Sequence, residues 1–159
     1  MRTLDDFIVV ATAEQVQLRV NTEALSRASE TYVDGIFHVP LLALTILVIA
    51  RERRAGLATT DLATWTIGTL VRHFDALQLA RGRIQWSVVL RRRCADALVF
   101  LEDVGLAGVH EAPSRTVHIS ANGRDLLRKL SHRADEVGVL VRQIERAYKA
   151  VNQSGLELL

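Results

Sequence analysis

Residues 101–130, "LEDVGLAGVHEAPSRTVHISANGRDLLRKL", contain the end of one helix, two short strands and the start of another helix. Gly105 offers the left-handed backbone conformation that commonly closes a helix. The runs Leu106–His110 and Arg115–Ile119 contain β-branched residues, and Pro113 between them suits a turn and not a central strand. We therefore predict a β-hairpin in this stretch.

The residues on either side of the hairpin predict helices. Ser120 stands at a helix-capping position, and Asp125 lies where an acidic side chain favours the positive end of the helix dipole. Before the hairpin, apolar residues recur at helical spacing at Ala97, Leu98, Leu101 and Val104. The expected order is helix, hairpin, helix.

The composition indicates one mostly α-helical domain. A chain of 159 residues is long enough for one hydrophobic core and short for two. Hydrophobic residues make up 49% of the chain and charged residues 24%, which is ordinary for a globular protein. Aromatic residues are only 5%, so aliphatic helix packing is favoured over an aromatic sheet core.

The sequence shows no sign of a membrane span or a leader peptide. The longest apolar run, residues 39–50, has 12 residues, whereas a span needs roughly 17–25. The first residues turn acidic at once, which is unlike a signal peptide. The single cysteine, Cys94, excludes an internal disulfide and is expected to be a small buried side chain. We expect a cytoplasmic protein that does not contact a membrane.

Four helices are expected in the first two thirds of the chain. Residues 12–32 repeat an apolar residue every four positions, which is typical of an amphipathic helix. Pro40 begins a helix that is apolar nearly all round and stops at Gly56, as a central core helix would. A third helix starts after Thr60 or Asp61 and buries Leu62, Thr66, Leu70, Phe74 and Leu77; the fourth runs from about Gln85 to Val104.

The C-terminal part carries the most regular pattern. Apolar residues from Leu127 to Val151 are spaced alternately by three and four residues, which predicts one long helix with a heptad stripe. Such a stripe either contacts a partner or covers the protein's own core, and both alternatives stay open here. The residues expected at a partner interface are Leu130, Ala134, Val137, Val141, Ile144 and Tyr148.

No pattern in the sequence predicts catalysis, a metal site or a bound cofactor. A glycine-rich phosphate loop is missing, so we do not expect the chain to bind and hydrolyse ATP in that way. The five histidines are scattered, and one cysteine is too few for a cysteine-rich zinc site. His132 and Glu136 are expected to form a surface pair on one helix face. We therefore expect a protein that is not an enzyme.

Positive charge is concentrated in the middle of the chain. Residues 41–100 hold nine arginines and four acidic residues, a net charge of +5, while residues 1–40 have a net charge of −3. Three consecutive arginines cannot all face one way on a helix, because successive residues are about 100° apart. These side chains either contact the phosphates of a nucleic acid or form a solvated or acid-pairing face. The candidate nucleic-acid contacts are Arg81, Arg83, Arg91, Arg92, Arg93 and Arg115.

The hairpin with the helices around it resembles the wing of MarR-like and related winged-helix proteins. The matching positions are Gly105, Leu106, Arg115, Val117, Ile119, Gly123 and Leu127. The resemblance implies that the helix over residues 85–104 is a recognition helix. About 35 residues separate Leu62 from Ala97, more than a compact MarR-type helix-turn-helix needs, which weighs against a plain transcription factor. The alternative is a helix–hairpin–helix unit without a nucleic-acid role.

In its layout, the chain from about residue 22 also resembles the middle component of three-component ABC-type systems, such as the Lamassu anti-phage and anti-plasmid systems. The resemblance lies in "HVPLLALTILVIARERR", in "RIQWSVVLRRRCADALVFLEDVGL", and in the wing and closing helix that follow. It implies a non-catalytic winged-helix accessory subunit that bridges an SMC-like ABC ATPase and an effector, expected to be a nuclease. Double-stranded DNA is a further candidate partner because of the arginine cluster, which could instead contact an acidic protein. The alternative is a homodimeric winged-helix regulator that dimerises through the closing helix and binds DNA.

These observations give a mostly α fold with a winged helix-turn-helix core, a small β-hairpin wing, and long N- and C-terminal helices. We expect an N-terminal helical segment over residues 1–36 and a winged-helix core over 37–130. The long C-terminal helix is expected over 124–153 and a tail over 154–159, all within a single domain.

Overall fold

The computed structural model describes residues 39–74, 87–111 and 113–154. The expected helix over residues 12–32, the N-terminal segment 1–36 and the tail beyond Ser154 lie outside the described residues. Within the described part, the helices are α3 (Val39–Glu52), α4 (Leu62–His73), α6 (Val88–Asp103), α7 (Ala121–Ser131) and α8 (Glu136–Ser154). The strands are β1 (Leu57–Ala58), β2 (Ala107–His110) and β3 (Thr116–Ile119). The fold is mostly α with a small antiparallel sheet, as predicted.

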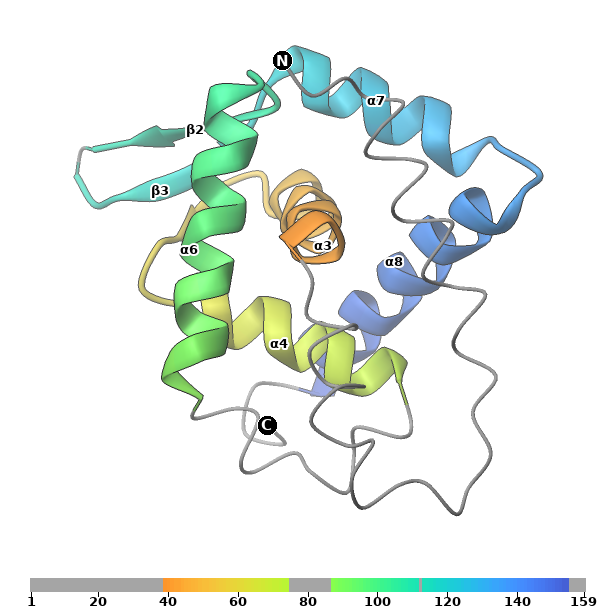
Figure 1. Ribbon diagram of the computed structural model, residues 1–159, viewed down its shortest axis with the longest axis horizontal. Helices are drawn as coiled ribbons and strands as arrows, with labels where there is room; N and C mark the ends of the chain where they lie inside the picture. Colours follow the sequence, from red (N-terminus) through yellow and green to blue (C-terminus); the bar gives the residue numbers. More distant parts are fainter. Residues whose placement is uncertain (1–38, 75–86, 112, 155–159) are drawn as a thin grey trace.

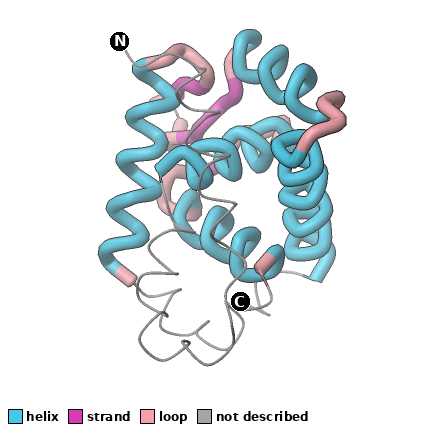
Figure 2. Tube along the Cα trace, turned by 45° about the vertical axis from the view of Figure 1, so that its right-hand side comes forward, coloured by secondary structure: helices cyan, strands magenta, loops and turns pink. Residues whose placement is uncertain are grey.

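Helix α3 lies at the centre of the described structure. Figure 1 shows it end-on, with α6, α7, α8 and α4 arranged around it, and Figure 2 shows the same helices after a 45° turn about the vertical axis. Residues 42–50 are all buried. This burial is expected, because a helix that is apolar on every side is stable only when other elements surround it. The buried Thr45 hydroxyl donates a hydrogen bond to the carbonyl of Leu41 at 2.8 Å, so it leaves no unsatisfied polar group. The predicted central core helix is confirmed.

Helix α4 packs its apolar face on α3 and α8. Asp61 is the residue before its first turn, as predicted, but its side chain makes no capping hydrogen bond. The buried hydroxyls of Thr66 and Thr69 donate to the carbonyls of Leu62 and Trp65 at 2.7 and 2.8 Å. Local hydrogen bonds of this kind allow threonine to lie inside a helix core. Of the expected buried face, Phe74 is half-buried and Leu77 lies outside the described residues.

The sheet has the strand order β1-β3-β2, and both pairs are antiparallel. In β3, Val117 is opposite Val109 of β2 and Leu57 of β1. Ala107, Val117, Ile119 and Leu57 are buried, so one face of the sheet covers the helical core. The predicted hairpin is confirmed, and Gly105 has the expected positive φ of 70°. Strand β1 was not predicted.

Ser120 connects the hairpin to the helices on either side of it. Its hydroxyl oxygen accepts a hydrogen bond from the backbone N–H of Gly123 at 3.0 Å, which caps α7. The same hydroxyl donates to the carbonyl of Gly105 at 2.8 Å, just past the end of α6. The predicted helix cap is confirmed, and it also fixes the start of α7 against the end of α6.

The prediction of one long C-terminal helix is wrong. Helix α7 ends at Ser131 and α8 begins at Glu136, and the chain turns sharply between them (Figure 1). The carboxylate of Asp135 accepts a hydrogen bond from Arg133 Nε at 2.7 Å and from the backbone N–H of Gly138 at 3.1 Å. These donors, Arg133 first, hold the pKa of the Asp135 carboxyl below its ordinary value. Arg142 Nη1 also donates to the carbonyls of Ser131 and Arg133, so the turn has its own polar partners.

The predicted partner stripe forms part of the chain's own core. Ala134 lies in the turn and is exposed, whereas the other five residues of the stripe are buried. Because α7 and α8 fold back on α3 and α4, both helices direct their apolar faces inward. The buried residues of the stripe are Leu130, Val137, Val141, Ile144 and Tyr148. They therefore do not form an exposed interface in this structure.

A polar cluster links the end of α3 to α4 and α8. The guanidinium of Arg53 lies 4.0 Å from the centre of the Trp65 ring, and its Nε donates to the Tyr148 hydroxyl at 3.1 Å. Beside it, Arg51 Nη2 lies 2.9 Å from a carboxylate oxygen of Glu145. Arginine stems can bury their carbon atoms while the charged group keeps polar partners. The basic end of α3 therefore belongs to the scaffold.

None of the helices in the described part of the chain combines the length and the apolar character that crossing a bilayer requires.

Candidate interaction surface on helix α6

Helix α6 is the expected recognition helix, and it lies beside the hairpin (Figure 1). It begins after Ser87, whose hydroxyl oxygen accepts a hydrogen bond from the Leu90 N–H at 3.4 Å. The side that faces α3 carries the buried residues Leu90, Cys94, Ala97, Leu98 and Leu101. This spacing of three and four residues anchors one side of α6 in the core and leaves the other side exposed.

The structure separates the three consecutive arginines around α6. Arg92 is exposed, whereas Arg91 and Arg93 are half-buried and have interactions of their own within the protein. The expectation that the three cannot face one way is therefore confirmed. They do not form one continuous basic patch.

Of the three other candidate nucleic-acid contacts, the structure describes Arg115. Arg115 is exposed on the hairpin, and its Nε lies 3.1 Å from a carboxylate oxygen of Glu111. Both side chains are largely open to solvent, so this ion pair adds little stability. Arg81 and Arg83 lie outside the described residues.

The exposed side of α6 carries a row of residues spaced by four, three and four positions. The row consists of Val88, Arg92, Ala95 and Val99. Val88 is 79% exposed and Val99 is 54% exposed, which is unusual for β-branched apolar residues. Asp96 and Asp103 lie along one edge of the row and are also exposed. We call these six residues the α6 surface.

Exposed apolar side chains are concentrated on this helix. Among the described residues, the large apolar side chains with high exposure are five valines. Four of them belong to α6 or directly follow it: Val88, Val89, Val99 and Val104. An apolar row of this kind, bordered by charged residues, is typical of a protein-contact surface.

Charge is unevenly distributed along α6. Its first half carries Arg91, Arg92 and Arg93, and its second half carries Asp96, Glu102 and Asp103. One carboxylate oxygen of Glu102 accepts a hydrogen bond from the Val109 N–H at 3.2 Å, which ties this residue to the hairpin. On the exposed side of α6, Arg92 is therefore followed by the acidic residues Asp96, Glu102 and Asp103 toward the C-terminal end.

Sequence reasoning missed the α6 surface because α6 carries apolar residues on two sides. The buried row and the exposed row interleave along residues 88–101, so the sequence shows no clean apolar and polar halves. The available signal was the spacing of Val88, Ala95 and Val99, whose positions differ by seven and four.

Cys94 lies on the buried side of α6, as predicted. Burial raises the pKa of its thiol to about 12, although the nearby positive charge of Arg91 acts in the opposite direction. Because the thiolate is the reactive form of cysteine, a thiol with this pKa is not poised to act as a nucleophile or a metal ligand. Cys94 is a packing residue.

The histidines of the described residues do not assemble a metal-binding cluster with other donors. The rings of His110 and His118 lie 4.5 Å apart on the outer face of the hairpin, and His118 Nε2 is 2.9 Å from the Thr116 hydroxyl. The expected His132–Glu136 pair on one helix face is wrong. His132 follows the end of α7, its Nδ1 lies 2.7 Å from the Arg128 carbonyl, and Glu136 starts α8.

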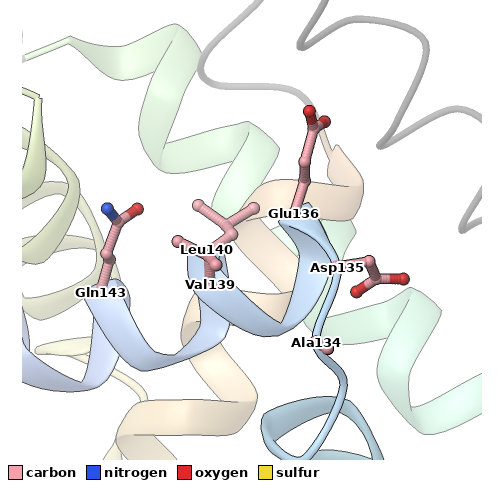
Figure 3. Close-up of a pocket in the computed structure, with 6 residues that line it drawn as sticks. All are labelled: Ala134, Asp135, Glu136, Val139, Leu140 and Gln143. Atoms are coloured by element: carbon pink, nitrogen blue, oxygen red, sulfur yellow. The ribbon is translucent and has the colours of Figure 1, made fainter.

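One open depression lies at the turn between α7 and α8. Its volume is about 460 Å³, and Figure 3 shows the six residues that line it: Ala134, Asp135, Glu136, Val139, Leu140 and Gln143. All of them come from a single stretch of chain. The Asp135 carboxylate already accepts hydrogen bonds from Arg133 and from the backbone N–H of Gly138 in the first turn of α8. The depression therefore brings together no set of groups suited to catalysis.

Comparison of the chain with protein-family models, with curated proteins and with solved structures gives no match.

Proposed function

We propose that the chain is a winged-helix accessory subunit, without catalytic activity of its own, that bridges an SMC-like ABC ATPase and an effector, expected to be a nuclease, in a bacterial defence complex. The proposal combines the resemblance of its layout to the middle component of three-component ABC-type systems with the chemistry of the α6 surface. The main support for a protein-binding role is the exposed apolar row of the α6 surface.

The order of the elements supports the winged-helix part of this proposal. Helix α3 is followed by β1, then by α4 and α6, and then by the β2–β3 hairpin. Strand β1 pairs with β3, so it ties the segment before α4 to the hairpin that follows α6. A recognition helix followed by a hairpin wing is the arrangement that the resemblance to winged-helix proteins implies.

The α6 surface favours protein over nucleic acid as a partner. DNA-binding helices present groups that satisfy phosphates and base edges, and net positive charge supplies much of their affinity. The α6 surface instead exposes valine side chains and places Asp96 and Asp103 along one edge. Exposed carboxylates repel phosphates. Exposed valine side chains, in contrast, favour a protein partner, because the contact removes their apolar surface from water.

The alternative is a homodimeric winged-helix regulator that binds DNA. The first two turns of α6 favour this regulator, because they expose Val88, Val89 and Arg92. The N-terminal residues of a recognition helix are those that contact the base edges of DNA. An apolar side chain can contact a thymine methyl group, and arginine can contact guanine. The regulator would however need another dimer contact, because the apolar stripe expected to supply it is buried in the core.

Co-purification tests the proposed function. We expect the tagged full-length chain, expressed at native level in its own host, to recover a large ATPase with coiled-coil segments. The partner should be identified by mass spectrometry and should remain bound after nuclease treatment, because the contact is between proteins. Ser114→Ala, an exposed change in the turn of the hairpin, serves as a control variant and should recover the same partner.

Recovery of the chain without an ATPase, together with specific binding to a duplex from its own promoter, would contradict the accessory role and support the regulator.

A further inference from the structure

We propose that the α6 surface is a self-association site, at which two copies of the chain pack their α6 helices antiparallel. This inference rests on the proposed function only because both assign α6 to contact with a protein. The protein that binds the α6 surface is here a second copy of the chain. Two observations carry it, namely the exposed apolar row and the reversal of charge along the helix.

The apolar row supplies a contact that one helix can offer to an identical helix. Val88, Ala95 and Val99 lie on one side of α6 and are exposed. Positions spaced by three and four residues form the seam along which two helices pack. Ala95 lies near the middle of the row, and its small side chain allows the two backbones to approach closely at the crossing point.

The charges on the α6 surface are self-complementary only in the antiparallel orientation. Arg92 lies before Ala95, and Asp96 and Asp103 follow it. When two copies are related by a two-fold axis at Ala95, Arg92 of each copy lies against the edge of the other that carries Asp96 and Asp103. A parallel pair would instead place identical charges side by side. Two-fold symmetry is the commonest arrangement of homodimers and requires this kind of self-complementarity.

The charged groups needed for this contact have no competing partner in the described part of the chain. Neither Arg92 nor Asp96 forms an ion pair or hydrogen bond with another described residue. The two residues are also four positions apart on one helix face, a spacing that permits an ion pair within the helix. They do not form it, so both remain available to a second copy.

The size of the contact predicts a weak dimer. A single pair of helices of 16 residues offers less than the roughly 800 Å² per partner of a stable protein interface. We therefore expect a dissociation constant on the order of micromolar, with a clear dependence on salt concentration because opposite charges meet across the contact. Dimerisation would also cover the side of α6 that a DNA groove would need.

Sedimentation velocity of the purified full-length chain over a dilution series tests the proposal. We expect a reversible monomer–dimer equilibrium for the wild-type chain. Val99→Glu should weaken dimerisation by roughly tenfold or more, because a charge replaces an apolar contact. Val139→Glu is the matched control, since Val139 is an exposed valine on α8, 41% open to solvent, and lies outside the α6 surface. It should dimerise like the wild type.

A charge-reversal experiment tests the antiparallel orientation itself. Arg92→Glu should dimerise poorly, and so should the double variant with Asp96→Lys and Asp103→Lys, because each places like charges together across the contact. A mixture of these two variants should form a heterodimer, since every reversed charge then meets an opposite one. Circular dichroism should show that each variant keeps the helical content of the wild type.

A chain that stays monomeric at all concentrations would overturn the proposal, and so would a dimer that Val99→Glu leaves intact or variants that fail to associate when mixed. None of these three results bears on the recovery of an ATPase, so the proposed function can fail or stand separately. A dimer without an ATPase partner would support the self-association site and contradict the accessory role.

Discussion

Val141→Glu should unfold the protein. Val141 is fully buried on the inner side of α8, where that helix packs against α4 and α7. Val141 belongs to the hydrophobic core cluster of the described residues, so a carboxylate introduced there would be buried among apolar side chains. An unpaired buried charge costs about 5 kcal/mol, comparable with the roughly 5–15 kcal/mol of total stability of a folded domain. Circular dichroism should show loss of the helical signal or of a cooperative urea transition.

Val139→Glu provides the matched control for this prediction. Val139 precedes Val141 by two residues on the same helix and is exposed. The same substitution there should change the free energy of unfolding by about 0.5 kcal/mol or less, as is usual for surface positions. A Val141→Glu variant that keeps its helical signal and its urea midpoint would show that this face of α8 is not in the core.

Gly123→Ala should be the most damaging of the small substitutions. Gly123 lies in the first turn of α7, and a Cβ there would be 2.2 Å from the Leu106 carbonyl oxygen and 2.8 Å from Ile119 Cγ1. The carbonyl belongs to the backbone and accepts a hydrogen bond from Ser120, so it cannot move freely. Alanine favours a helix over glycine by up to about 1 kcal/mol, but the overlap requires α7 to shift away from the sheet. We expect a net loss of about 3 kcal/mol in the free energy of unfolding, measured by urea denaturation.

Gly108→Ala is the control for the glycine substitution. Gly108 lies in β2, and a Cβ there would meet no atom within 4 Å. The change should leave the free energy of unfolding within about 0.5 kcal/mol of the wild type. Equal stability of the two variants would mean that the close approach of α7 to the hairpin is not required for the fold.

Local signals were sufficient to predict the hairpin and its surroundings. Gly105, Pro113 and Ser120 each impose a particular backbone conformation or a capping hydrogen bond, and these effects act over a few residues. The structure confirms the two predicted strands to within one residue at their starts. Strand β1 was missed because Leu57–Ala58 has two residues and no period of its own. It forms only by pairing with β3, which is distant in the sequence.

The break between α7 and α8 shows where periodicity misleads. The three- and four-residue spacing continues across the turn, because both helices direct their apolar faces into one core. Residues 132–135 contain no glycine or proline to signal a break. Asp135 followed by Gly138 was the available indication, since an aspartate caps a helix through the N–H three residues later. Gly138 is also required there, because a Cβ would lie 2.1 Å from the Arg133 carbonyl.

The candidate site was predicted only in part. The sequence located the helix that carries the basic triplet, and helical geometry predicted that the three arginines would diverge. Which side of that helix would be buried depended on how α3 packs against it, and a single sequence does not contain that information directly. In the structure, Arg92 is exposed beside a row of exposed valines, whereas Arg91 and Arg93 are half-buried.

Titration of a labelled DNA duplex with the full-length chain, followed by fluorescence anisotropy, most directly tests whether the α6 surface contacts protein or nucleic acid. The wild-type chain, Arg92→Glu and Arg146→Glu should be compared at low and physiological salt, with Arg146 as an exposed arginine on α8 outside the α6 surface. The account predicts weak binding that salt abolishes, with the two variants differing from each other by less than about twofold, as for sequence-independent phosphate contacts. Tight binding at physiological salt that only Arg92→Glu removes would contradict it.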